Sequence, residues 1–182
     1  MYWCKLRLFT TIAFIGGVML GGIACRPDVK DTGNKYFDIK GYFTADTLRL
    51  KKLNKLVTKT VTHNGVTETK KVKIANWGQE LDMFIGADIN KPAWKNSYTV
   101  FNSDNVLLYK AKDEDLKVRE VMIKLDKQKV KWMLIFTRTQ NILYKTTERL
   151  SYFPDSLYLI QKDQHIKLMG NNHYIIQGVI ER

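Results

Sequence analysis

The sequence predicts an α+β domain in which two N-terminal helices and a β-hairpin precede a curved antiparallel meander sheet. Two early segments repeat apolar residues at three- and four-residue steps, which is typical of amphipathic helices. Asn64-Gly65 separates two runs rich in threonine and valine, and from Ser97 onward apolar and polar residues alternate almost without interruption. A β-sandwich with helices at one end is the alternative arrangement of the same elements.

The first expected helix begins after Asp38, a residue type that caps helix N-termini well. Basic side chains, among them Lys40 and Arg49, occupy the side opposite the apolar stripe. The stripe consists of Ile39, Tyr42, Phe43, Leu50 and Leu53.

A β-hairpin is expected next, in the stretch LVTKTVTHNGVTETKKVKI. Threonine and valine favour strands because their branched side chains pack well on a pleated surface. Asn64-Gly65 stands in the middle, and both residues tolerate the positive φ angles of a type I′ turn.

A second helix is predicted from about Trp77 to Ile89, with Asn76 as its cap. Pro92 prevents the helix from continuing, because proline lacks the backbone N–H that a helix interior requires. The apolar stripe consists of Trp77, Leu81, Phe84 and Ile85.

About seven strands are expected from Ser97 to the C-terminus. One strand has an apolar face formed by Val130, Trp132, Leu134 and Phe136, which alternate with Lys129, Lys131 and Met133. The next places on one face Ile142, Tyr144, Leu150 and Tyr152. The apolar parity flips between Val118 and Val121, which predicts a β-bulge near Arg119-Glu120. Turns are expected at 126–128, 153–155 and 170–172.

Residues 1–24 have the order of a secretory signal peptide. Lys5 and Arg7 form a positive start, and the 17 residues from Leu8 to Ala24 carry no charge. Residues 25–35 are polar and predict a flexible tether, and residues 36–182 are expected to form a single domain. Without residues 1–24 the remaining 158 residues carry 28 Lys and Arg against 18 Asp and Glu, a formal charge of +10.

Gly22-Ile23-Ala24-Cys25 resembles the lipobox of bacterial lipoproteins, although that family prefers leucine where Gly22 stands. The resemblance implies cleavage before Cys25, a diacylglycerol on its sulfur and an acyl chain such as palmitate on its amine. Several acyl chains hold a protein stably on a membrane. Arg26 follows the cysteine, where aspartate favours inner-membrane retention in this family, so an outer-membrane location is expected. An uncleaved signal anchor is the alternative.

The stretches FDIKGYF, KTVTHNGVTETKKVKI, ADINKPAW and YFPDSLY resemble segments of a family of small Bacteroidota lipoproteins. The resemblance covers most of the chain after Cys25. It implies a location in the cell envelope, on the periplasmic face or the cell surface, and the extent of the domain. It implies no activity and no functional residue.

Titratable residues offer little catalytic chemistry. His63 is expected at the hairpin tip, and His165 and His173 are expected to flank a late turn, without a third metal ligand at a recognisable spacing. The acidic run 113–115 lacks the glycine and the spaced glutamate of a calcium loop. Glu148 is the one acidic residue on the apolar face of its strand. It is expected either to face a ligand or to prevent pairing at a sheet edge. Four serines lack a nucleophile elbow, namely Ser97, Ser103, Ser151 and Ser156.

Basic and aromatic residues are spread over the strands. Lys and Arg alternate along the chain without a cluster, and export removes the protein from cytoplasmic nucleic acid. A solvated face or attraction to anionic lipid explains the charge. The aromatic residues are core, or they line a pocket for an apolar ligand in the curved sheet. That pocket would be lined by Trp94, Trp132, Phe136, Tyr144 and Tyr152.

These features favour a non-enzymatic binding or scaffold module of the envelope, without a cofactor or bound metal. Its expected partners are the membrane, through the N-terminal lipid, and an envelope protein or an anionic lipid surface. Two alternatives remain. One is a carrier of a lipid or other apolar ligand. The other is a hydrolase with a dispersed site, in which His165 or His173 is the base and Asp163 an acid.

Overall fold

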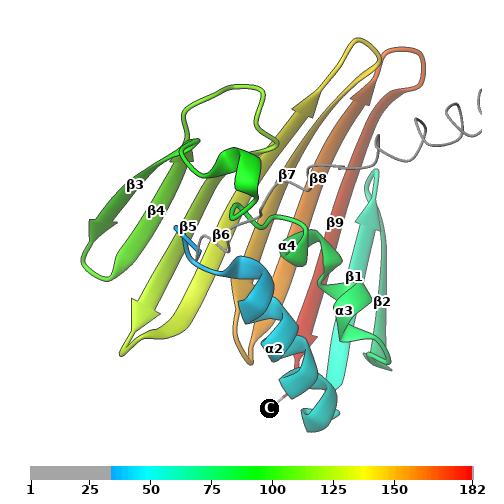
Figure 1. Cartoon of the computed structure of the whole chain (residues 1–182). Coiled ribbons are helices and arrows are strands. Elements are labelled where there is room, and N and C mark those ends of the chain that lie inside the picture. Colours follow the sequence, from blue (N-terminus) through cyan, green and yellow to red (C-terminus); the bar gives the residue numbers. More distant parts are fainter. Residues whose placement is uncertain (1–33, 182) are drawn as a thin grey trace, which may run out of the picture. The chain divides into compact units, whose positions relative to one another are not determined.

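Residues 34–181 form a nine-stranded antiparallel sheet with helices on one face (Figure 1), as described by a computed structural model. Cys25, the lipobox-like segment and most of the tether lie outside these residues. The strand order is β2-β1-β9-β8-β7-β6-β5-β4-β3. The strands are β1 (Leu56–His63), β2 (Val66–Lys73), β3 (Tyr98–Ser103), β4 (Val106–Ala111), β5 (Val118–Asp126), β6 (Lys129–Gln140), β7 (Tyr144–Phe153), β8 (Leu157–Ile166) and β9 (Gly170–Ile180).

The sheet confirms the predicted hairpin and meander. β3 to β9 are seven consecutive strands, each paired with the next, and the β1–β2 hairpin joins the sheet because β1 pairs with β9. Asn64 and Gly65 have φ angles of 47° and 88°, as the type I′ turn requires. All nine strands belong to one sheet, so the two-layer sandwich is not the architecture of residues 34–181.

The first helix, α2 (Ile39–Leu53), begins where predicted. The side chain of Asp38 accepts a hydrogen bond from the backbone N–H of Gly41 at 2.8 Å. The buried face runs through Ile39, Phe43, Asp46, Thr47 and Leu50. Leu53 was expected on this stripe but is 44% exposed, and it is the last residue of the helix.

The second predicted helix is wrong in length. Two four-residue helices, α3 (Trp77–Glu80) and α4 (Asp82–Ile85), replace the helix expected to reach Ile89. Leu81 interrupts them with φ −102° and ψ 17°, and α4 ends at Gly86, a residue type that favours helix termini. Asn76 does cap α3, since its side chain accepts from the N–H of Gln79 at 3.1 Å. Further on, Pro92 begins the 3₁₀ helix η1 (Pro92–Trp94).

Strand β6 faces the opposite way from the prediction. Met133, Ile135 and Thr137 are buried toward the helices, so Trp132 and Phe136 point to the other face. Apolar residues occupy both faces of this strand, so the alternation of residue types did not reveal which face packs against the core. The bulge near Arg119-Glu120 is confirmed by a register shift between Val118 and Glu120. The last turn lies at 167–169 instead of 170–172, because Gly170 already begins β9.

Aromatic rings pack closely between α2, α4 and strand β7. Phe43 of α2, Phe84 of α4 and Tyr152 of β7 are fully buried, with ring centroids 5.0–5.8 Å apart. No helix among residues 34–181 is long and apolar enough to span a bilayer.

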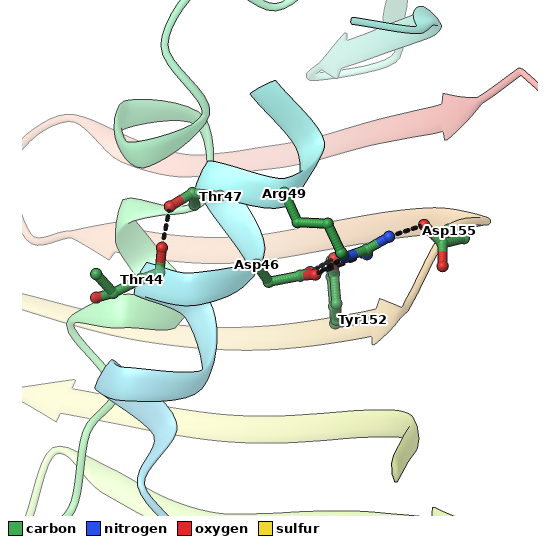
Figure 2. Close-up of polar contacts among 6 residues, drawn as sticks. All are labelled: Thr44, Asp46, Thr47, Arg49, Tyr152 and Asp155. Atoms are coloured by element: carbon green, nitrogen blue, oxygen red, sulfur yellow. Dashed lines mark hydrogen bonds and ion pairs between the residues drawn. The ribbon is translucent and has the colours of Figure 1, made fainter. Parts of the chain in front are cut away.

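Two carboxylates, the buried Asp46 and the partly buried Glu80, connect the helices to the sheet. Figure 2 shows Asp46 of α2 between Arg49, at 2.6 Å, and the hydroxyl of Tyr152, which donates to it. Arg49 also reaches Asp155 at 2.5 Å. Glu80 of α3 accepts from Tyr158 of β8 and pairs with Lys59 of β1 at 2.6 Å. Burial and the adjacent carboxylates raise the pKa of both tyrosines well above its usual value.

Candidate binding surface

The sheet face opposite α2, α3 and α4 carries at least one apolar side chain on every strand from β3 to β9. We call it the open face, because no helix covers it within residues 34–181 (Figure 1). Strand pairing places its side chains on the parity opposite the core, and none belongs to the core cluster. Its apolar residues on β3 to β9 are Phe101, Val106, Leu108, Met122, Trp132, Leu134, Phe136, Phe153, Leu157, Leu159, Ile175 and Val179.

Cross-strand pairing makes the apolar surface continuous from β3 to β6. Phe101 of β3 faces Leu108 of β4, which faces Met122 of β5, which faces Leu134 of β6. Directly paired residues lie close enough for their side chains to touch. Phe101 is 52% exposed and Leu134 36%, so water reaches the row at both of its ends.

This arrangement departs from the usual pattern of a half-exposed sheet. An antiparallel sheet with one solvated face normally alternates apolar residues inside with polar residues outside. β8 instead begins with Leu157-Tyr158-Leu159-Ile160, in which Tyr158 and Ile160 are core and the two leucines lie on the open face. A large contiguous apolar patch on a soluble domain marks an interaction site. The open face is therefore the candidate binding surface.

Basic residues are interspersed with this apolar surface and surround it. Six of them outnumber the three acids, Glu120, Asp126 and Asp163, that share the parity of the open face on β4 to β9. The six are Lys110, Lys124, Lys129, Arg138, Lys145 and Arg149. The guanidinium of Arg149 lies 6.0 Å from the ring centroid of Phe136. The surface therefore favours a partner that carries negative charge.

The five predicted pocket residues do not meet around one cavity. Tyr152 is fully buried beneath α2, whereas Trp132 and Phe136 lie on the open face. Trp94 belongs to η1 and packs partly against the core, with Lys91 4.2 Å from its ring centroid. Tyr144 shares the parity of Tyr152 but begins β7, at the opposite end of that strand.

The structure brings together the residues named for the hydrolase alternative. Nδ1 of His173 lies 2.5 Å from Oδ1 of Asp163, and both line a pocket of about 410 Å³ with His165 and Thr147. Asp163 pairs with Thr147 on β7 and with His173 on β9, so β8 separates the hydroxyl from the imidazole. Two strand spacings amount to about 9–10 Å, far beyond a hydrogen bond. Thr147 is therefore out of hydrogen-bond reach of the His173 imidazole.

The other titratable residues considered as functional candidates either contact neighbouring side chains or lie exposed on the surface. His63 stacks on Tyr174 with ring centroids 4.3 Å apart. Glu148 is only 8% exposed and accepts from Thr137 at 2.8 Å, and its strand β7 is internal, so it does not block an edge. The acidic run 113–115 lies exposed between β4 and β5. Within residues 34–181 no three His, Cys, Asp or Glu side chains are grouped to hold a metal ion.

Sequence reasoning missed the open face. The signal was present in the run WMLIF of β6, which is apolar on both parities and therefore typical of a strand covered on both sides. No family model, curated protein or solved structure matches the chain significantly.

Proposed function

We propose that this chain is a lipid-anchored, non-enzymatic binding module of the bacterial envelope. It docks through the open face on a protein whose contact surface is apolar at its centre and acidic at its rim. The observation that carries the proposal is the continuous apolar row from Phe101 to Leu134 on a face that no helix covers within residues 34–181.

A protein suits this face better than hydrocarbon does. Arg149, Gln161 and Gln177 stand among its apolar residues, and buried polar groups need hydrogen-bond partners that acyl chains do not provide. Protein interfaces combine an apolar centre with such hydrogen bonds. The seven strands from β3 to β9 make the face about 30 Å wide at the ~4.8 Å spacing of strands, which is wide enough for an interface of standard size.

The excess of basic residues on the open face favours an acidic partner protein over a second copy of this chain. A second copy of the chain would bring like-charged surfaces together, since basic residues outnumber acidic ones on the face. An acidic rim on the partner would instead pair with Lys124 and Arg149 while the apolar residues are buried. The lipobox-like segment before the domain supports a place on the membrane.

One observation favours the carrier as a second candidate. A pocket of about 540 Å³ lies between the α3–α4 segment and the sheet, with Ile160, Ile176 and Met83 among its lining residues. Lys59 and Glu80 also line it, and their charges suit the wholly apolar surface of a carried ligand less well. Native mass spectrometry of the gently extracted protein decides this point, because a stoichiometric lipid adduct would favour the carrier.

Site-specific photo-crosslinking tests the binding role. The photoreactive residue p-benzoylphenylalanine replaces Leu134 on the open face or, as the control, Leu48, which is 60% exposed on α2. After irradiation of intact envelopes we expect one discrete protein adduct from position 134 and none from position 48. The crosslinked peptide should be rich in Asp and Glu.

A charge-reversal pair makes the test specific. Lys124→Glu with Arg149→Glu should abolish the adduct, whereas Lys51→Glu with Lys52→Glu on α2 should leave it unchanged. An adduct that survives reversal on the open face contradicts the proposal. So does an adduct of two copies of this chain, or crosslinking to lipid alone.

A further inference from the structure

His165 and His173 lie diagonally on adjacent strands at one end of the open face. The pairs His165↔Asn171 and Asp163↔His173 are two residues apart in the β8–β9 register, so the four side chains form a square on one surface. Diagonal neighbours in an antiparallel pair are about 7–8 Å apart at their Cα atoms, within reach of two imidazoles that bridge one ion.

Each imidazole is held through the same ring nitrogen. Nδ1 of His173 is 2.5 Å from Oδ1 of Asp163, and Nδ1 of His165 is 2.6 Å from Oδ1 of Asn171. An ionised carboxylate and an amide oxygen can only accept a hydrogen bond, so each Nδ1 must be the donor. In the neutral imidazole the lone pair is then on Nε2, and both histidines present the same tautomer.

This arrangement has the features of a metal-binding histidine pair. Histidines that bind metals through one nitrogen usually donate the other N–H to a carboxylate or carbonyl, which fixes the ring. Both rings line one pocket of about 410 Å³, and His173 and Asp163 are 46% and 50% exposed, so an ion has direct access from water. Imidazole nitrogen suits zinc, copper and nickel better than calcium or magnesium.

We propose that His165 and His173 bind one divalent transition-metal ion, such as Zn²⁺, through their two Nε2 atoms. Asp163 and Asn171 orient the rings and do not coordinate. Within the described chain no group of three His, Cys, Asp or Glu side chains is placed to hold a metal, so water completes the coordination shell. The bound ion is therefore exchangeable and leaves open positions for a donor from a partner.

Zinc titration of the full-length chain in detergent micelles tests the site, with the histidine ring nitrogens followed by ¹⁵N NMR. Before zinc is added, His165 and His173 should both show protonated Nδ1 and unprotonated Nε2. Zinc should shift the Nε2 signals of these two residues together and leave His63 unchanged. The ring signals identify the ligands whatever else in the chain binds zinc.

Variants measured by calorimetry complete the test. His165→Ala and His173→Ala should each weaken binding at this site more than about tenfold, and Asp163→Asn by about tenfold through loss of ring orientation. His63→Ala is the matched control and should change nothing. The proposal is overturned if zinc leaves either Nε2 signal unmoved, if the apo rings are protonated at Nε2, or if the His63 variant weakens binding equally.

Discussion

Replacement of Tyr152 by phenylalanine should destabilise the domain by about 2 kcal/mol. The Tyr152 ring is fully buried and stays in place in the variant, so no cavity forms. What disappears is the hydroxyl that donates to Oδ2 of Asp46, a side chain that is 7% exposed. A hydrogen bond to a charged group contributes about 1.5–3 kcal/mol. Asp46 keeps Arg49 on its other oxygen, at 2.6 and 2.7 Å, which limits the loss.

Urea denaturation followed by circular dichroism measures the effect. Tyr174→Phe is the matched control, because no hydrogen bond of its hydroxyl is found within residues 34–181, and it should change the free energy of unfolding by less than about 0.5 kcal/mol. The double variant with Asp46→Ala isolates the pair, and we expect a coupling energy of about 1–2 kcal/mol. If the Tyr152→Phe protein is as stable as the Tyr174→Phe control, or if the coupling energy is near zero, the hydrogen bond between Tyr152 and Asp46 does not stabilise the packing of α2 on β7.

Three further predictions concern the core, the pH response and the anchor. Gly178→Ala should destabilise the domain by about 1–3 kcal/mol, measured by the same urea assay, because the added Cβ would lie 2.2 Å from ring atoms of the buried Tyr158. Burial raises the pKa of Tyr98 from 10.0 to about 12, so the folded state favours the neutral side chain. The stability that Tyr98 contributes through this shift is fully present below pH 10 and is lost as the pH rises to about 12. Tyr98→Phe should flatten the fall of unfolding free energy in that window, and an unchanged slope would contradict the cause. Mass spectrometry of the N-terminal peptide should find Cys25 carrying diacylglycerol, whereas an intact chain starting at Met1 would rule out lipobox cleavage.

Elements defined by local chemistry could be predicted from the sequence. Asp38 and Asn76 cap their helices, and Asn64-Gly65 forms the hairpin turn, because each depends on neighbours only a few residues away. The break at Leu81 depends on packing between short helices and the sheet, for which periodicity carries no signal. The pairing of β1 with β9 joins segments more than a hundred residues apart, so no local pattern revealed it.

The His173–Asp163 pair was predictable only in part. The sequence named these residues as possible neighbours, but the β8–β9 register decides which acid faces which histidine. The same register places Thr147 on the far side of Asp163, which weakens the hydrolase alternative. Catalytic geometry of this kind depends on strand order, and a one-residue slip would move every one of these side chains to the other face.

The wrong parity assigned to β6 bears directly on function. Met133 and Ile135 fill the core beneath the helices, yet Trp132, Leu134 and Phe136 are as apolar as a second core would require. A strand that is apolar on both faces normally lies between two layers. The helices supply one layer, and residues 34–181 contain no second helical layer for the open face. The presence of apolar residues on both faces of β6 made the sequence ambiguous, and it is also the reason to expect a partner that covers the open face. The crosslink from position 134 is designed to identify that partner.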